Sequence, residues 1–245
     1  MTTLNIFPAI DMRGGKCVRL FKGDYAQETV YGDSPFEMAK SFSEAGAPYV
    51  HMVDLDGAKD GERVHAKDVL RVAKELPIKV QIGGGIRTEE DVRFYLEQGV
   101  DRVIIGSLAI REPELVASFI EKFGAERIVI GLDAKDGMVA THGWLETSNQ
   151  TAVEVGKFFA SKGAKYFIFT DIATDGTLQG PNIPANELLA NETGAEVIVS
   201  GGMSSLADIT AVKAAAENTS ISGVIIGKAL YTGQFTLAEA LQEAK

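Results

Sequence analysis

An internal repeat constrains the fold of this chain more than any other feature. Four short motifs of the first half recur in the same order about 120 residues further on, which is the signature of a duplicated unit. In the first half they lie at 11, 53–55, 83–86 and 103–107, and in the second at 133, 170–172, 200–203 and 224–228. The matching positions are Asp and Gly residues at the ends of apolar segments, so the repeat concerns a site as well as a scaffold.

Apolar segments alternate with helical patterns along the whole chain. The sequence predicts strands near 4–10, 49–54, 78–82, 102–106, 127–132, 166–171, 196–200 and 223–227. It predicts helices near 35–46, 66–75, 88–98, 112–122, 150–162, 184–193, 204–216 and 234–243. Strands such as 127–132 are apolar on successive residues, which is typical of parallel strands covered on both faces.

This pattern predicts an α/β protein with a (β/α)8 TIM barrel made of two repeated half-barrels. We expect one domain over residues 1–245, with half-barrels at about 1–123 and 124–245. A doubly wound open sheet is the alternative, but it has no reason to be two-fold symmetric at this period. The longest stretches that we expect to be irregular follow predicted strands, at 12–34, 55–64, 134–148 and 172–183.

Composition excludes several classes of function. The net charge of −10 argues against a nucleic-acid surface, although backbone N–H groups can still hold a phosphate locally. No apolar segment is long enough to span a bilayer, and we expect no signal peptide. A single cysteine, Cys17, excludes an intrachain disulfide and suits a reduced cytoplasm. The half-barrels need no second chain to close, so we expect a monomer.

Two aspartates are the first candidates for catalysis. Asp11 ends the first predicted strand and Asp133 ends the fifth, and these strands are diametrically opposed in an eight-stranded barrel. Two carboxylates would then face each other across the mouth, as one general acid and one general base require. The alternative is that each caps the next turn or pairs with a nearby lysine, such as Lys16 or Lys135.

Glycine-rich turns form the second group of candidates. They follow the third, fourth, seventh and eighth predicted strands, where glycine lets the backbone approach a ligand and the next helix offers free N–H groups. A pair of such sites related by the repeat indicates a ligand with a phosphate at each end. The alternative is tight turns that need glycine for their own geometry. The residues concerned are Gly83, Gly84, Gly85, Gly106, Ser107, Gly201, Gly202, Gly227 and Lys228.

Other polar residues near these turns carry more open interpretations. Asp171 and Asp175, with their counterparts Asp54 and Asp56, could orient ribose hydroxyls or be structural. Thr170 is a hydroxyl partner for Asp133, and Arg19 faces an anion in this interpretation. Trp144 lies in a loop, where it packs either on a heterocyclic base or on the protein itself. His51, interpreted as a strand residue, His65, interpreted as a surface residue, and His142 lack metal-ligand spacing, so we expect no metal and no cofactor.

Together these motifs resemble the phosphoribosylformimino-aminoimidazole carboxamide ribotide (ProFAR) isomerases of histidine biosynthesis. The resemblance covers essentially the whole chain and includes the segments 8–11, 53–58, 83–87, 143–144, 170–177, 200–202 and 224–228. It implies that Asp11 is the general base, Asp133 the general acid and Thr170 an assisting residue. It also implies that Arg87 and Trp144 help to hold a bis-phosphorylated ribotide whose phosphates lie at the glycine turns.

The implied reaction is an Amadori rearrangement from aldose to ketose, which needs proton transfers but no metal or redox cofactor. The sister cyclase shares the fold, the repeat and both aspartates. It usually has Cys-Leu-Asp in place of Ala9-Ile10-Asp11 and Lys in place of Arg19, and it lacks the Gly143-Trp144 pair. Two further alternatives are an enzyme that also isomerises phosphoribosyl anthranilate and a phosphate-ligand sensor without catalysis, which carboxylates at the mouth disfavour.

Overall fold

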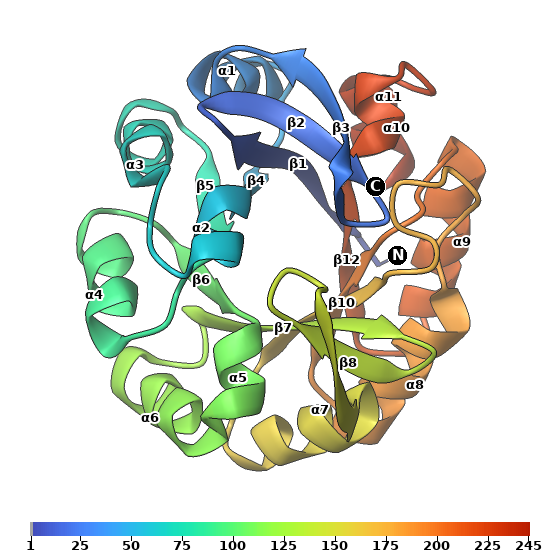
Figure 1. The fold of residues 1–245 in the computed structure, drawn as a ribbon. Coiled ribbons are helices and arrows are strands. Elements are labelled where there is room, and N and C mark those ends of the chain that lie inside the picture. The colour runs from blue at the N-terminus through green and yellow to red at the C-terminus, as the bar shows by residue number, and fades with distance from the viewer. Residues whose placement is uncertain (1) are drawn as a thin grey trace.

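A closed parallel barrel forms the centre of the molecule (Figure 1), as described by a computed structural model over residues 2–245. Each barrel strand pairs with the next along the chain, and the last pairs with the first, Asn5 opposite Gly223. The barrel strands are β1 (Asn5–Arg13), β4 (Tyr49–Asp54), β5 (Lys79–Gly83), β6 (Arg102–Ile105), β7 (Ile128–Lys135), β10 (Tyr166–Asp171), β11 (Glu196–Ser200) and β12 (Ile221–Ile226). The predicted TIM barrel is therefore confirmed.

Helices that connect or follow the barrel strands surround the barrel on its outside (Figure 1). They are α1 (Pro35–Glu44), α3 (Ala66–Glu75), α4 (Glu89–Glu97), α6 (Pro113–Phe123), α7 (Ala152–Ser161), α8 (Ile183–Thr193), α9 (Leu206–Ala216) and α11 (Leu237–Glu243). Their starts are encoded locally. Thr88 and Asp91 form a reciprocal capping box at α4, and Ser205 and Asp208 form the same box at α9. The predicted helices are confirmed.

Three of the four stretches expected to be irregular carry regular structure. The stretch after β1 folds into the hairpin β2 (Lys16–Phe21) and β3 (Asp24–Gly32), and the stretch after β7 into β8 (Met138–Thr141) and β9 (Glu146–Thr151). The short helix α2 (Leu55–Asp60) follows β4. Sequence patterns missed β3 and β9 because both strands are largely exposed and polar, with no buried face to give a period. Residues 172–182 contain no helix or strand, as expected.

Two more short helices, α5 (Ser107–Arg111) and α10 (Lys228–Tyr231), directly follow β6 and β12. The hairpins, these helices and the irregular segment 172–182 all lie at the carboxyl ends of barrel strands. No helix within residues 2–245 combines the length and the apolar character needed to cross a bilayer.

Packed side chains fill the barrel below this end. Apolar residues from alternate strand positions form one interior cluster that includes Phe7, Ile104, Ile168 and Ile225. At the amino ends of the strands, the guanidinium of Arg102 lies 4.1 Å from the ring centroid of Tyr166 and 5.3 Å from that of Tyr49. These residues fill the lower end of the barrel, and the cavity described below lies at the carboxyl ends of the strands.

Candidate active site

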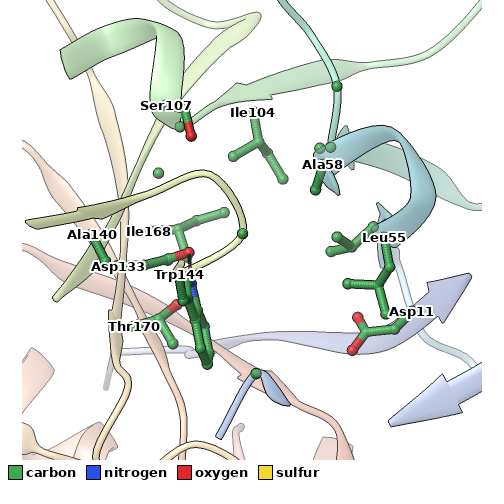
Figure 2. A pocket seen from close by; sticks show the side chains of 18 of the residues that line it. Asp11, Leu55, Ala58, Ile104, Ser107, Asp133, Ala140, Trp144, Ile168 and Thr170 are labelled. Carbon is green, nitrogen blue, oxygen red and sulfur yellow. Dashed lines mark hydrogen bonds between the residues drawn. The ribbon is translucent and has the colours of Figure 1, made fainter. Parts of the chain in front are cut away.

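A cavity of about 220 Å³ opens at the carboxyl ends of the strands (Figure 2). Its lining brings together residues that the sequence analysis selected far apart in the chain: Asp11, Arg19, Gly84, Gly85, Arg87, Gly106, Ser107, Asp133, Trp144, Thr170 and Asp175. A second, narrower cavity of about 20 Å³ is lined by the remaining predicted residues, Gly201, Gly202, Gly227 and Lys228. Arg19, Asp175, Ser200 and Ile225 line both cavities, so the two meet at these side chains.

Asp11 and Asp133 point into the cavity from opposite sides (Figure 2). Asp11 pairs with Arg19, whose Nη1 lies 3.0 Å from its Oδ2, and the two side chains are only 15% and 11% exposed. Burial raises the pKa of Asp11, and the positive charge of Arg19 acts against that rise. The arginine reaches Asp11 because β2 runs antiparallel to β1 and places Val18, its neighbour, opposite Asp11.

Asp133 has neutral partners instead. The indole N–H of Trp144 donates to its Oδ2 at 2.6 Å, and Thr170 stands directly beside it in the register of β7 and β10. Burial raises the pKa of Asp133, while the hydrogen bonds of Trp144 and Thr170 act in the opposite sense. The two aspartates related by the repeat therefore lie in different environments, one beside a cation and one beside uncharged donors.

Asp175 is a third buried carboxyl group of this site. It lies in the irregular segment after β10, at the boundary of the two cavities, and its backbone C=O accepts a hydrogen bond from Lys22 N at 3.2 Å. Burial raises the pKa of Asp175 to about 6; Arg19 lowers it, and the neighbouring charges of Asp11 and Asp133 raise it further. A carboxyl group with this pKa titrates near pH 6. The sequence alone did not indicate this raised pKa.

The glycine turn after β5 leaves no room for a side chain. Gly84 has φ +103°, and a Cβ added there would lie 2.2 Å from Asp54 O. The adjoining Arg87 places its guanidinium beside Gly61, where a Cβ would lie 2.3 Å from it. The geometry of this turn therefore requires glycine, and the backbone of the turn also lines the cavity.

The corresponding turn after β11 is built in the same way. A Cβ on Gly202, which has φ +85°, would lie 2.3 Å from Gly180 O. The repeat extends to the residues before the short helices, because Gly106 (φ −105°, ψ −94°) and Gly227 (φ −114°, ψ −96°) share one backbone conformation and neither helix has a side-chain cap. Of the polar side chains here, Lys228 Nζ donates to Gly176 O at 3.0 Å.

Trp144 is half-buried and packs on the protein itself. A Cβ on Gly23, at the turn of the β2–β3 hairpin, would lie 1.9 Å from Cε3 of the indole. The hairpin that follows β1 thus contacts the loop between β8 and β9, which follows β7. His142 N in the same loop donates to the Ser107 hydroxyl at 2.9 Å. The indole lines the cavity while resting on the hairpin.

The acidic residues after β4 are structural. The buried Asp54 accepts backbone hydrogen bonds from Gly57, Val64 and His65 at 2.7 to 2.8 Å. Asp56 accepts from Gly14 N at 2.8 Å and contacts His65 Nε2 at 2.6 Å. The interpretation of His65 as a surface residue is wrong, since its side chain is 8% exposed under this cluster.

The same cluster bears on the expectation that the protein binds no metal, which was based on the spacing of the histidines. Asp54, Asp56 and His65 offer ligand atoms that all lie within 4.8 Å of one another, although their spacing in the sequence matches no metal motif. Hydrogen bonds within the protein already account for the carboxylate oxygens of Asp54 and for Oδ2 of Asp56. After β10, Asp171 has a similar structural role, accepting from Ala173 N at 2.9 Å and from Asn182 Nδ2 at 2.8 Å.

The predicted site omitted several cavity residues, among them two basic side chains, His51 and Arg111. His51 on β4 was interpreted correctly as a strand residue, and its side chain lines the cavity. Arg111, at the end of α5, also lines the cavity. Neither residue belongs to the repeated motifs. For His51, the alternation of side chains along β4 is the sequence signal that could have placed it in the barrel interior.

Comparison with known proteins gives a consistent result. Residues 5–236 match the family model described as "Histidine biosynthesis protein". The chain is 61% identical over 242 residues to a protein of Geobacillus thermodenitrificans (strain NG80-2), covering 99% of this chain and 98% of the other. It is 56% identical over 245 residues to a protein of Bacillus subtilis (strain 168), covering 100% of this chain and 99% of the other.

Both relatives carry the name 1-(5-phosphoribosyl)-5-((5-phosphoribosylamino)methylideneamino) imidazole-4-carboxamide isomerase. The match of the family model spans nearly the whole barrel, including the strand ends and turns that line both cavities. The chain therefore belongs to the histidine biosynthesis protein family.

Proposed function

We propose that this protein is an isomerase of histidine biosynthesis that converts the ribotide ProFAR to its phosphoribulosyl form. The observation that carries the proposal is the pair of carboxylates, Asp11 and Asp133, facing each other across one cavity. The names of the relatives from Geobacillus thermodenitrificans and Bacillus subtilis support the same substrate. The reaction is an intramolecular transfer of hydrogen from C2 to C1 of a sugar.

The proposed mechanism uses one acid and one base. Protonated Asp133 donates to the ribose ring oxygen, the C1–O bond breaks and a protonated imine forms at C1. Ionised Asp11 then removes the proton from C2, which gives a neutral enolamine. Asp11 returns this proton to C1 while the C2 hydroxyl passes its own proton back to Asp133 and becomes the ketone. Arg19, 3.0 Å from Asp11, favours the ionised base, while Asp133 has neutral donors, Trp144 and Thr170, beside it.

Asp175 is the competing candidate for the acid. Its pKa of about 6 lies closer to neutrality than that of an ordinary carboxyl group, so a useful fraction is protonated under working conditions. An open-chain analogue of the substrate separates the roles, since it needs no ring opening. The analogue should restore part of the rate to whichever variant lacks the acid, Asp133→Asn or Asp175→Asn. If it restores Asp11→Asn instead, the acid and base assignments must be exchanged.

The two phosphates of the substrate are assigned to the two glycine regions. Gly84, Gly85, Gly106 and Ser107 would hold one phosphate and Gly201, Gly202, Gly227 and Lys228 the other, because their free N–H groups suit an anion. Arg87 stands beside the first group. A crystal soaked in sulfate should contain an anion at both regions, and anions bound elsewhere with both regions empty would contradict the assignment.

All steps of the proposed reaction are proton transfers, so the mechanism uses neither metal nor redox cofactor. We also infer a cytoplasmic monomer without nucleic-acid or membrane partners, based on the charge of −10, the single cysteine and the self-contained barrel. Light scattering of the purified protein should give the mass of one chain, 26.2 kDa. A stable dimer would contradict the monomer.

A turnover assay on the purified protein tests the proposed function. Three substrates are supplied separately, in the presence and absence of EDTA: ProFAR, the phosphoribulosyl product with ammonia, and phosphoribosyl anthranilate. We expect turnover of ProFAR that EDTA leaves unchanged. Consumption of the product with ammonia alone would favour the cyclase, turnover of phosphoribosyl anthranilate would add the second isomerase activity, and binding without turnover would favour a sensor.

A further inference from the structure

Tyr231 joins the glycine region after β12 to the strand that carries the proposed base. It is the last residue of α10, the short helix that begins at Lys228 beside the narrower cavity. Its hydroxyl donates to the backbone C=O of Ala9 at 2.6 Å, across 222 positions of the sequence. Ala9 precedes Asp11 by two residues on β1, so one side-chain hydrogen bond links the helix at a proposed phosphate site to the main chain of the proposed base.

This hydrogen bond lies where the pairing of β1 with β12 ends. The two strands are paired in register up to Pro8 opposite Ile226. Ala9, which lines the larger cavity, is the first residue of β1 beyond this pairing, because the chain leaves β12 after Ile226 to start α10. The Tyr231 hydroxyl therefore continues the connection between the two segments beyond their last backbone pair.

The hydroxyl of Tyr231 is a neutral donor in packed surroundings. Burial raises the pKa of Tyr231; the positive charge of Arg19 acts against this rise, and the negative charge of Asp11 adds to it. The phenol ring packs against Tyr31, with 5.1 Å between ring centroids, and against Phe42, with 6.4 Å. A protonated hydroxyl on a ring held in this way keeps the Ala9 carbonyl in one place.

The repeat provides an internal comparison for this contact. In the alignment of the two half-barrels, Tyr231 corresponds to Ile110 on α5, and Ala9 corresponds to Gly131 on β7. The pairing of β6 with β7 ends at the equivalent place. Isoleucine has no hydroxyl, so α5 cannot form this hydrogen bond to β7. The contact therefore distinguishes the half-barrel side of the proposed base and is not a requirement of the short helix itself.

A second contact connects the same two places. A Cβ added to Gly227 would lie 2.3 Å from Nη2 of Arg19, so the guanidinium rests against this glycine. Nη1 of the same guanidinium lies 3.0 Å from Oδ2 of Asp11. In the other half-barrel, a Cβ on Gly106 would meet only Gly131 O, at 4.0 Å. Two contacts thus connect the glycine region after β12 with the proposed base, one through the main chain of β1 and one through the carboxylate.

We propose that Tyr231 is a positioning residue, which couples a phosphate bound at the glycine region after β12 to the placement of Asp11 beside C2 of the sugar. The inference rests on the proposed isomerase function. An anion bound where α10 begins fixes the helix, and the hydroxyl at the helix end fixes the carbonyl two residues before the base. A base that is slightly misplaced transfers its proton more slowly while the phosphates still bind. The effect of Tyr231 should therefore fall on kcat more than on KM.

Removal of the hydroxyl tests the positioning role. Tyr231→Phe keeps the ring, and we expect kcat for ProFAR to fall roughly three- to tenfold, the usual effect of one lost neutral hydrogen bond, with KM changed about twofold at most. Tyr31→Phe, which removes a hydroxyl from the neighbouring ring, is the matched control and should leave both constants unchanged. A folded Tyr231→Phe variant with the wild-type kcat, or with its loss confined to KM, would overturn the proposal.

A double-mutant cycle separates coupling to the phosphate from a general loss of structure. Lys228→Met weakens the proposed phosphate site after β12, and Ser107→Ala weakens the one after β6. Tyr231→Phe should lower kcat less in the Lys228→Met background than in the wild type, whereas its effect should multiply with that of Ser107→Ala. The same factor in all three backgrounds would mean that Tyr231 supports the structure alone, and would contradict the coupling.

The wild type allows a measurement that needs no variant of Tyr231. Exchange of its hydroxyl proton with water, followed by NMR of protein with 13C-labelled tyrosine, reports how often the bond to Ala9 opens. Because coupling is reciprocal, saturating inorganic phosphate should slow this exchange. Exchange that bound phosphate leaves unchanged would overturn the proposal even if Tyr231→Phe fails to fold. Absence of ProFAR turnover by the wild type contradicts the isomerase and with it this inference, whereas turnover with phosphate-independent exchange contradicts only the inference.

Discussion

Single residues break the symmetry that the repeat imposes on this site. Asp11 and Asp133 hold equivalent positions at the ends of opposed strands, yet one contacts the guanidinium of Arg19 and the other the indole of Trp144. A cation favours the ionised carboxylate more strongly than a neutral donor does. The proposed assignment of base and acid therefore depends on which side chain each following hairpin supplies, rather than on the aspartates themselves.

The first expected outcome concerns the proposed base. Asp11→Asn should lower kcat by at least about 10²–10⁴-fold, because the amide cannot accept the C2 proton. Substrate affinity and melting temperature should remain near wild type, since the amide oxygen still accepts from Arg19. Steady-state kinetics and thermal unfolding measure these effects, with the exposed Asp60→Asn as control. More than a tenth of the wild-type kcat would rule out Asp11 as the base.

A second outcome concerns the indole. Trp144→Phe removes the N–H that stabilises the charged form of Asp133, so the pKa of this carboxyl group should rise further. If Asp133 acts in its protonated form, the alkaline limb of the kcat profile should move to higher pH. The profile against pH for both proteins measures the shift. An unmoved or acid-shifted limb would argue that Asp133 is not the acid.

At the scale of elements, the site depends on segments that interrupt the barrel pattern. The hairpins after β1 and β7 bring Arg19 and Trp144 to the aspartates, and both hairpins fall in stretches expected to be irregular. Barrel strands are recognisable because burial on both faces requires continuous apolar residues. A hairpin strand such as β3, with exposed polar side chains, is specified by pairing alone and leaves no such pattern.

The same reasoning explains which part of the site the sequence reveals. Repeated motifs mark the strand ends and turns. The predicted catalytic residues and glycine turns line one or both cavities, whereas Asp54, Asp56 and Asp171 line neither. Contacts between side chains from different strands are not visible in the sequence. No local sequence pattern indicates that Gln81 contacts His51, or that burial raises the pKa of Asp175 to about 6. Contacts across strands depend on register, which is set only when the barrel closes.

A third prediction concerns the contact between Gly23 in the β2–β3 hairpin and Trp144 in the β8–β9 loop. Gly23→Ala should displace Trp144, because a Cβ would lie 1.9 Å from its ring. Gly15→Ala is the matched control, since φ is +80° there against +73° at Gly23 but no atom lies within 4 Å of the added Cβ. As Trp144 is the one tryptophan of the chain, a red shift of its emission in Gly23→Ala alone would report the displacement. Equal spectra for both variants would contradict the contact.

At the scale of the whole molecule, the barrel divides into a packed lower part and a polar upper part. Apolar residues and the Arg102 stack close the lower part, while Asp11, Asp133 and Asp175 are buried together above. Burial of like charges costs stability, which the lower part must offset. We propose that the chain is one domain of two half-barrels, 1–123 and 124–245, each contributing one of the opposed aspartates Asp11 and Asp133.

The free energy of unfolding should consequently rise when the carboxyl group of Asp175 is removed. The pKa of Asp175 is about 6 in the folded protein, against an ordinary value of 3.8 for an aspartate, so the folded state holds more protons than the unfolded chain between these limits. The free energy of unfolding therefore falls as pH rises from about 4 to 6, by at most about 3 kcal/mol from this group. Asp175→Asn should melt several degrees above wild type at pH 7.5, roughly 2–4 °C per kcal/mol, with a smaller difference at pH 4.5.

Thermal unfolding of both proteins at the two pH values measures this difference. The variant should also lose activity, whichever of substrate binding or proton transfer Asp175 serves. A variant that melts below wild type at pH 7.5 would mean that the attraction between Asp175 and Arg19 outweighs the cost of burial.

The close approach of backbone to backbone at the glycine turns has a consequence for how the protein can be diversified. At Gly84 and Gly202 an added Cβ would meet the carbonyl oxygen of a neighbouring loop, Asp54 or Gly180, and a carbonyl oxygen cannot be repacked as a side chain can. Variant libraries aimed at new substrates should leave these positions fixed and randomise Arg111, His51 and the loop around Trp144. Selection would then act on the part of the ligand between its two phosphates, while the phosphate sites proposed at these turns stay unchanged.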